Sequence, residues 1–235
     1  VAMENAAPVY VYRVRATDAA ETVVSYPGGW AAKLGLSADD TTLVTCSTAG
    51  PSAQVWDADS GSAQSEVLAL PHGGINLTDR IVAVAPDGSS FAVRTLTNIQ
   101  QYDSASGEPV GPPVSCGADA PALAYSPDAA FLALADSSQV RFLNRVDSGQ
   151  TASVDVGARI ADLAFSPSGT FLAVAVGAEV RFLAYPTGEE VFEAIAHSRP
   201  IAHLALDAGG VLLATVTRDN AARAWDIATG VALGP

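Results

Sequence analysis

Two short sequence signals recur along the chain at a nearly constant interval. The first is a turn rich in Pro, Asp, Gly or Ser that leads into an apolar stretch. Its last residues are spaced 48, 41, 40 and 41 positions apart: Leu43, Phe91, Leu132, Leu172 and Leu213. The second is an apolar residue shortly before a glycine, with spacings of 46, 41, 40 and 42: Trp56, Tyr102, Leu143, Leu183 and Trp225. Two independent signals with one period of about 40 to 45 residues indicate an array of equivalent units.

Each unit has the pattern of four antiparallel strands. β-branched and aromatic residues form short runs bounded by Gly, Pro, Asp and Ser, and no stretch has convincing helical spacing. This pattern and period are typical of β-propeller blades. We therefore expect an all-β fold, a single β-propeller domain over residues 1–235. Its expected blades are 29–70, 71–116, 117–157, 158–197 and 198–235, preceded by a partial blade, 1–28, that lacks its first strand.

The number of blades bears on how the ring closes. Propellers usually close when one terminus completes the blade that the other began. Five to six visible blades with an incomplete first one predict part of a seven-bladed ring, with the remainder outside this chain. A closed six-bladed ring is the alternative.

Several motifs resemble the WD40-repeat family, and the resemblance covers nearly the whole chain. Trp-Asp pairs stand at 56–57 and 225–226, and a Ser-Pro-Asp turn stands at 126–128. In that family a His, a Thr, an Asp and a Trp at these motif positions form a buried, hydrogen-bonded tetrad. In the last blade the resemblance implies a structural tetrad of His197, Thr217, Asp219 and Trp225, with the indole donating to Thr217 and His197 bridging Thr217 to Asp219.

The other blades depart from the family pattern. Ala49 stands where the second blade should have its Asp, and Leu143 and Leu183 replace Trp in the fourth and fifth blades. We expect those blades to depend on apolar packing. The segments 106–113 and 228–235 resemble connections in the WD40 domains of bacterial multidomain signalling proteins.

The charge balance disfavours some partners. The chain has 25 acidic and 12 basic side chains, a formal net charge of −13. An acidic field repels phosphate, so nucleic acid and anionic membrane are not expected as partners. No apolar run approaches the length of a membrane span, and the start of the chain lacks the layout of a signal peptide. We expect a cytoplasmic protein.

Catalytic and metal-binding motifs are absent from the sequence, which predicts no enzyme activity, no cofactor and no metal. Among the other His and Cys residues, His203 is expected to pack in an apolar strand and His72 to lie in a solvated loop. Cys46 is expected to be buried, and Cys116 is a weak candidate for a reactive thiol.

Acidic and basic side chains are expected on opposite rims. In each unit, the turn between the first and second strands and the turn between the third and fourth strands carry most of the aspartates. These side chains are expected to cap turn backbone groups. They are Asp39, Asp40, Asp57, Asp59, Asp87, Asp103, Asp128, Asp147, Asp207 and Asp226. The other connections carry Arg80, Arg159, Arg199 and Arg218. Arginine is favoured at interfaces because its planar fork binds carboxylates, and the family most often docks peptides on this rim. The alternative is that these arginines pair with Asp79, Asp119 and Asp219.

These observations predict a non-catalytic protein–protein interaction scaffold or sensor within a larger protein or complex, which binds an acidic peptide or a neighbouring domain. The alternative is a propeller enzyme of lactonase or hydrolase type that acts at the central channel. Such an enzyme needs His, Glu or Asp from several blades on one rim, and the candidate rim carries mainly arginines.

Overall fold

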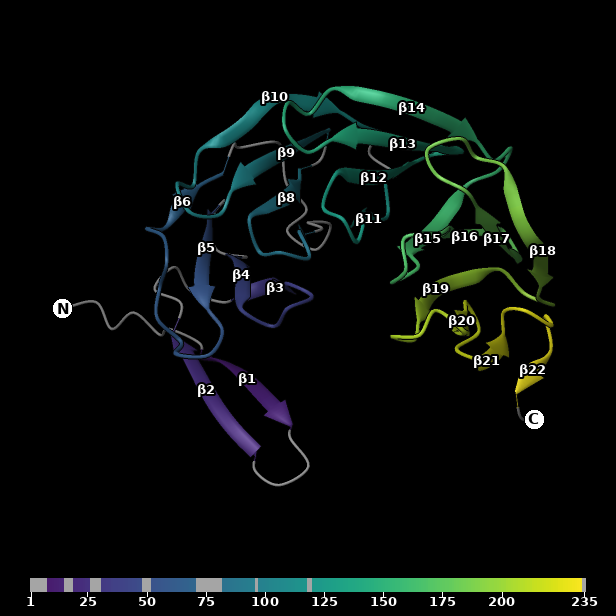
Figure 1. Ribbon diagram of the computed structural model, residues 1–235, viewed down its shortest axis with the longest axis horizontal. Coiled ribbons are helices and arrows are strands. Elements are labelled where there is room, and N and C mark those ends of the chain that lie inside the picture. Colours follow the sequence, from purple (N-terminus) through teal and green to yellow (C-terminus); the bar gives the residue numbers. More distant parts are fainter. Residues whose placement is uncertain are drawn as a thin grey trace. The chain divides into compact units, whose positions relative to one another are not determined.

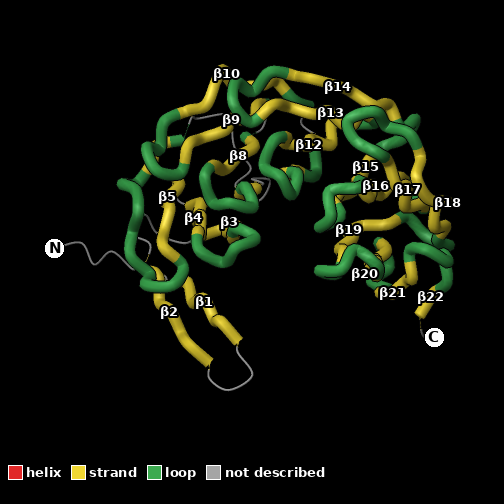
Figure 2. Tube along the Cα trace, viewed as in Figure 1, coloured by secondary structure: helices red, strands yellow, loops and turns green. Residues whose placement is uncertain are grey.

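A computed structural model describes residues 8–14, 19–25, 31–47, 52–70, 82–95, 97–117 and 120–233. Every regular element in these ranges is a β-strand (Figure 2), so none is a helix that could span a membrane. The strands form five four-stranded antiparallel sheets and one two-stranded sheet. The chain divides into two compact units, 1–115 and 116–235, and each is described by itself. The expected single domain stays a prediction.

The first unit contains the two-stranded sheet and two four-stranded sheets (Figure 1). Strands β1 (Pro8–Val14) and β2 (Ala19–Ser25) pair within the expected partial blade, where three strands were predicted. Any third strand of that blade would lie outside the described residues. The four-stranded sheets are β3 (Ala31–Leu36), β4 (Thr42–Ser47), β5 (Ser52–Asp57) and β6 (Leu68–Ala69), then β7 (Val82–Val84), β8 (Ser90–Arg94), β9 (Asn98–Asp103) and β10 (Pro109–Ser115).

The second unit contains three consecutive four-stranded sheets, in which strands adjacent in sequence are adjacent in space. The first has β11 (Leu123–Tyr125), β12 (Phe131–Asp136), β13 (Gln139–Asn144) and β14 (Gln150–Asp155). The second has β15 (Ile160–Phe165), β16 (Leu172–Val176), β17 (Glu179–Leu183) and β18 (Glu190–Ala196). The third has β19 (Ile201–Leu206), β20 (Leu212–Thr217), β21 (Ala222–Asp226) and β22 (Ala232–Leu233).

Tight turns join the strands, and their residues explain why the repeat is legible. Gly88, Gly169 and Gly210 have φ near +66°, +71° and +65°, a left-handed conformation that glycine adopts without a Cβ clash. At Gly107 a Cβ would lie 2.4 Å from Cδ2 of Leu68, so both the backbone and the neighbouring sheet require glycine there. The turn residues therefore recur along the sequence because each four-stranded sheet repeats the same tight turns between its strands.

Apolar side chains fill the space between successive sheets. In the second unit one cluster joins Ala133, Val140 and Phe142 of one sheet to Leu172 and Leu183 of the next. A second cluster joins Phe171, Ala173 and Phe182 to Leu213 and Trp225 of the last sheet. The central strand β16 is therefore buried at every residue, because both of its faces are covered.

Candidate functional site

The best-defined polar site lies in the last sheet, around the indole of Trp225. Its Nε1 donates a hydrogen bond to Oγ1 of Thr215 at 3.0 Å, in a buried position. Nε2 of His197 lies 2.8 Å from the same hydroxyl, and Nδ1 lies 3.3 Å from the carbonyl oxygen of Ile195. One proton arrangement satisfies all three contacts: Thr215 accepts from the indole and donates to Nε2, and Nδ1 donates to the carbonyl.

Burial, aided by the charge of Arg223, lowers the pKa of His197 below 6.5, although the Ile195 carbonyl acts in the opposite direction. The imidazole is therefore neutral at neutral pH, as this proton arrangement requires. The ring also packs beside Trp225, with 4.7 Å between ring centroids. The His–Thr–Trp contacts join strands β20 and β21 to the residue that follows β18.

The expected role of Thr217 in this site is wrong. Thr217 instead donates to Oδ1 of Asp219 and to the carbonyl of Ala221, within the β20–β21 turn. The cause is distance along the strand. Trp225 pairs with Leu213, and Thr215 is the next residue on the same face of β20, so its hydroxyl lies within reach of the indole. Thr217 lies two residues further, about 7 Å away along the strand. His197 and Trp225 thus meet at Thr215, while Asp219 belongs to the turn.

A second Trp–Thr pair lies in the β3–β6 sheet, where the sequence motifs did not predict one. Nε1 of Trp56 donates to Oγ1 of Thr45 at 2.8 Å. The register is the same as in the last sheet, because Trp56 pairs with Leu43 and Thr45 lies two residues beyond it. Ala49, the expected substitute for the family's Asp, lies outside the described residues.

Two sheets replace this polar pair with apolar contacts, as the sequence predicted. Leu143 and Leu183 occupy the Trp position, and the residues at the Thr position are Leu134 and Val174. All four are buried. Trp occurs with Thr, and Leu with Leu or Val, so at these positions of the described sheets each indole has a hydroxyl acceptor and each Leu has an apolar neighbour.

Two of the predicted rim arginines lie on adjacent loops. Arg199 is in the β18–β19 connection and Arg218 in the β20–β21 turn, and the backbone N–H of Arg218 donates to the carbonyl of Pro200 at 2.9 Å. Nε of Arg199 lies 4.0 Å from Asp219, with both side chains more than half exposed, so this pair contributes little to stability. Arg159 is exposed in the β14–β15 connection.

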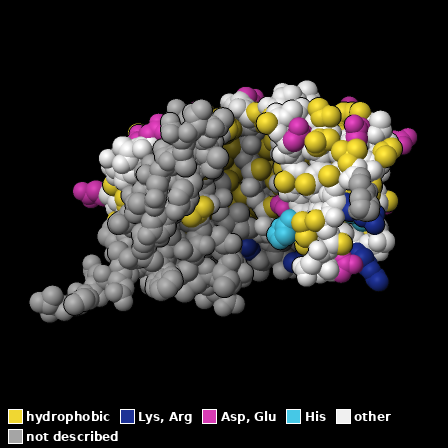
Figure 3. All heavy atoms as spheres, turned by 90° about the horizontal axis from the view of Figure 1, so that it is seen from below, with side chains coloured by type: hydrophobic (Ala, Val, Ile, Leu, Met, Phe, Trp, Pro, Cys, Tyr) yellow, Lys and Arg dark blue, Asp and Glu magenta, His cyan; other side chains and the backbone are white. Residues whose placement is uncertain are grey.

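The remaining rim residues, Arg80, Asp79 and Asp119, lie outside the described residues, as does His72. On the face drawn in Figure 3, several acidic side chains lie along the upper edge of the coloured region at the right, and Lys or Arg side chains lie lower, with an acidic group beside them. The separation of charge onto two rims stays a prediction.

His203 differs from its expected packing role. Its side chain is 77% exposed, and Nδ1 lies 3.5 Å from Oδ2 of Asp162 on the neighbouring sheet. Asp162 also accepts from the backbone N–H groups of Leu163 and Leu204, at 2.9 and 3.1 Å. Burial raises the pKa of Asp162, and these three contacts partly offset that rise. Oδ2 of Asp162 thus links strand β15 to strand β19, while Oδ1 accepts from the N–H of Leu163 within its own strand.

A further polar position recurs in the third strand of each sheet, two residues before the Trp, Tyr or Leu. Gln100 donates to the carbonyls of Val110 and Gly111 in β10, and Gln54 donates to that of Ser65. Arg141 donates to Gln150 in β14 at 2.7 Å, and Nε of Arg181 lies 4.0 Å from Glu190 in β18. These side chains fasten the third strand to the fourth strand or the segment before it.

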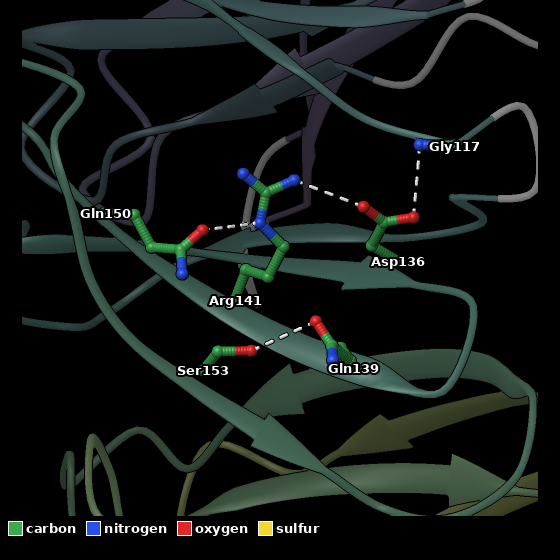
Figure 4. A network of polar contacts seen from close by, with 6 residues as sticks. All are labelled: Gly117, Asp136, Gln139, Arg141, Gln150 and Ser153. Atoms are coloured by element: carbon green, nitrogen blue, oxygen red, sulfur yellow. Dashed lines mark hydrogen bonds and ion pairs between the residues drawn. The ribbon is translucent and has the colours of Figure 1, made fainter.

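The network around Arg141 also reaches the start of its sheet (Figure 4). Nη1 of Arg141 lies 3.1 Å from Oδ2 of Asp136, and Oδ1 of Asp136 accepts from the N–H of Gly117. Ser153 and Gln139 form a separate contact beside it, at 3.3 Å. Both side chains of the ion pair are at most one-fifth exposed, so the network is a structural feature.

The turn aspartates cap backbone and hydroxyl groups, as predicted. Asp57 accepts from Ser60, Asp128 from Ser126 and Ala130, and Asp226 from Thr229. These bonds lower the pKa of each carboxyl group below its ordinary value. Of the cysteines, Cys46 is buried as expected and Cys116 is partly buried.

Among the described residues, no group of three or more His, Cys, Asp or Glu side chains could hold a metal ion. Neither a family model nor a curated protein matches this chain. The function proposed below is therefore inferred from the geometry of the described loops.

Proposed function

We propose that the chain is a WD40-like β-propeller module that acts as a protein-interaction scaffold or sensor in a larger protein or complex. The five consecutive four-stranded antiparallel sheets support the fold, because each has the strand order of a propeller blade. In this proposal the basic rim that includes Arg159, Arg199 and Arg218 binds an acidic peptide or an acidic domain surface.

One observation carries the binding proposal: Arg199 and Arg218 project from adjacent loops, and both side chains remain accessible. Asp219 lies at the limit of an ion pair with Arg199 and is more than half exposed. Arg218 has no ion pair or side-chain hydrogen bond among the described residues. An incoming carboxylate could therefore contact both guanidinium groups without breaking a buried interaction.

The enzyme alternative finds its best support in the Asp162–His203 pair. An exposed imidazole beside a buried carboxylate resembles an acid–base pair. Within the described residues, however, neither side chain contacts a third titratable group or a nucleophilic side chain. We therefore favour binding over catalysis.

The test is a direct binding measurement with a short fluorescein-labelled oligoglutamate peptide, followed by anisotropy. We expect saturable binding that weakens as salt rises, because salt screens contacts between exposed charges. The double reversal Arg199→Glu/Arg218→Glu should abolish binding and leave the melting temperature nearly unchanged, since both side chains lie on exposed loops.

The matched control is Arg199→Lys/Arg218→Lys, which keeps the charge and removes the planar fork. It should bind more weakly than the native chain and more tightly than the reversal. A labelled oligolysine peptide controls for attraction to the net negative charge. Unchanged oligoglutamate binding by the reversal variant would disprove the role of this rim.

A further inference from the structure

A pocket lies between the two four-stranded sheets of the first unit, beside their fourth strands, β6 and β10 (Figure 1). We call it the β6–β10 pocket. Its volume is about 440 Å³, and two residues of its wall, Ala69 and Pro109, are exposed, so it is open to solvent. The other described residues that line it are Leu68, Leu70, Gln100, Tyr102 and Gly107. Of these side chains, only the Gln100 amide and the Tyr102 hydroxyl are polar.

The core of the first unit holds the walls of this pocket in place. Leu70 and Tyr102 are 3% and 5% exposed and belong to one apolar cluster that joins the two sheets. The ring of Tyr102 stacks on that of Phe91, with 5.2 Å between ring centroids. Gly107 lies so close to Leu68 that the turn admits no side chain there. The pocket is therefore formed before any ligand enters it.

The equivalent place in the second unit shows which group fits between two such sheets. Arg181 is the counterpart of Gln100, since each stands in the third strand of its sheet at the same register with the second strand. Nη1 of Arg181 donates to the carbonyl of Val156 at 3.2 Å, and Nε lies 4.0 Å from Glu190. Val156 follows β14 of the preceding sheet, as Leu70 follows β6. There, an arginine of the chain itself bridges two successive sheets.

Gln100 does not make this bridge in the first unit. Its Nε2 donates to the carbonyls of Val110 and Gly111, at 3.3 and 3.1 Å, and both belong to β10 of its own sheet. The pairing of β9 with β10 shifts register between Val110 and Val114, and Gly111 has a φ of +65°. This irregularity turns the two carbonyls toward the amide. The shorter side chain is thus held within its own sheet, and the space that an arginine crosses in the second unit is left as the pocket.

We propose that the β6–β10 pocket binds one arginine side chain of a partner protein, whose guanidinium takes the role that Arg181 has in the second unit. Its aliphatic stem packs against Leu68 and Pro109, and its guanidinium lies beside the aromatic ring of Tyr102, which attracts cations. Glu108 stands between two wall residues, is exposed and forms no ion pair with a described residue. It pairs with the guanidinium at the mouth of the pocket.

The chemistry of the pocket favours arginine over other side chains. The carbonyl of Leu70 is the counterpart of the Val156 acceptor, and a planar guanidinium can donate to it and to Glu108 at the same time. A lysine ammonium is a more strongly hydrated point charge, so its transfer into apolar walls costs more free energy. The net charge of −13 also attracts a cationic segment and repels an acidic one. This proposal is independent of the basic rim, which binds the opposite charge.

The test is a titration of the whole isotope-labelled chain with N-acetylarginine methylamide, followed by NMR of the backbone amides. We expect saturable shifts at Leu70, Tyr102 and Gly107, which line the pocket. The lysine analogue should bind more weakly, and the uncharged citrulline analogue should cause no shifts there. Added salt should weaken binding of the arginine probe, because the Glu108 carboxylate is exposed.

The variant Gln100→Arg fills the pocket from within, as Arg181 fills the equivalent place, and should abolish these shifts. Its matched control is Ala105→Arg, which adds the same charge at an exposed turn residue outside the wall and should leave binding unchanged. Glu108→Gln removes the carboxylate at the mouth without touching the core, and should weaken binding about two- to fivefold. Glu193→Gln removes another exposed carboxylate, in the second unit, and should have no effect.

Unchanged binding by a folded Gln100→Arg variant would overturn the proposal. Equal shifts with the arginine and lysine probes, spread over the turn aspartates, would show attraction to the net charge alone and would overturn it as well. If Gln100→Arg does not fold, equal affinities of Glu108→Gln and Glu193→Gln would reject the pocket. The reversal Arg199→Glu/Arg218→Glu should bind the arginine probe as the native chain does, so failure of the basic rim is distinguishable from failure of this pocket.

Discussion

The hydroxyl of Thr215 contacts two ring nitrogens at once, one of the buried Trp225 and one of the half-buried His197. It accepts from Trp225 and contacts His197, and its residue is only 2% exposed. A buried donor that loses its partner costs more free energy than an intact hydrogen bond contributes. The stability of the last sheet should therefore depend on this hydroxyl more than on that of Thr217, whose partner Asp219 has a side chain that is 53% exposed and can bond water instead.

We predict that Thr215→Val lowers the free energy of unfolding by roughly 1 to 3 kcal/mol, because valine keeps the shape and removes the hydrogen-bonding oxygen. Thr217→Val is the matched control, and its loss should be below about 1 kcal/mol. Urea denaturation followed by Trp fluorescence measures both. Equal losses in the two variants would contradict the assignment of Thr215.

Strand alternation alone could not identify the Thr that bonds the indole. Thr215 and Thr217 lie on the same face of β20, and both precede the turn, so the family pattern alone did not separate them. The register settles the choice, because the Trp pairs with a Leu two residues before its hydroxyl partner in both Trp-bearing sheets. Register is not written in the sequence of one strand, since it depends on the turn that joins two strands.

At the scale of strands and sheets, Asp162 joins two sheets that are separate in hydrogen bonding. Its carboxylate bonds the N–H of Leu204, whose residue is 8% exposed, and it contacts the imidazole of His203. This contact could not be predicted from the chain alone, because Asp162 and Leu204 lie 42 positions apart. Only the packing of β15 against β19 brings them together.

We predict that Asp162→Ala lowers the free energy of unfolding by roughly 1 to 3 kcal/mol, because the N–H of Leu204 loses its acceptor. Asp162→Asn should cost less, since its amide oxygen can still accept and the desolvated charge is removed. Asp147→Ala, which removes an exposed turn carboxylate, is the control. Urea denaturation at neutral pH checks all three, and equal losses for the Asn and Ala variants would refute the role of the acceptor oxygen.

The polar residue in the third strand of each four-stranded sheet is a third signal that repeats along the sequence, and its role was not predicted. Gln54, Gln100, Arg141, Arg181 and Arg223 each stand two positions before the aromatic or Leu of the second repeat signal. The pattern is recoverable once the repeats are aligned. The contacts are not, because Gln100 reaches carbonyls of the fourth strand, Arg141 reaches a side chain there, and Arg181 also reaches the carbonyl of Val156 in the segment before its sheet.

For the whole molecule, the all-β class and the five strand quartets could be predicted because turn residues and strand lengths repeat with one period. Exposure could not be predicted in this way. His203 is the example, because its apolar strand predicted packing, whereas its side chain is 77% exposed beside Asp162 of the neighbouring sheet.

Charge also acts on the whole molecule, through the many turn carboxylates. Hydrogen bonds lower the pKa of seven described carboxyl groups below 3.8: Asp39, Asp57, Asp128, Asp155, Asp207, Asp219 and Asp226. The strongest cause is a turn N–H or hydroxyl in each case. A carboxyl group whose pKa is lower in the folded state than in the unfolded state stabilises the fold above the unfolded value, and this stabilisation is lost as the pH falls through the folded value.

We therefore predict that the urea midpoint falls as the pH is lowered below 3.8, because the unfolded chain then binds protons that the folded turns exclude. His197 adds a smaller loss that begins below 6.5, since its pKa is lowered on folding, and the raised pKa of Asp162 opposes both changes. Near neutral pH, added salt should weaken the repulsion caused by the net charge of −13. The loss of stability at acidic pH should remain, because the turn hydrogen bonds are short and salt screens them little.

The variant Asp207→Asn/Asp226→Asn should reduce the slope of the urea midpoint against pH in this acidic range. An unchanged slope in that variant would show that the turn carboxylates do not control acid stability.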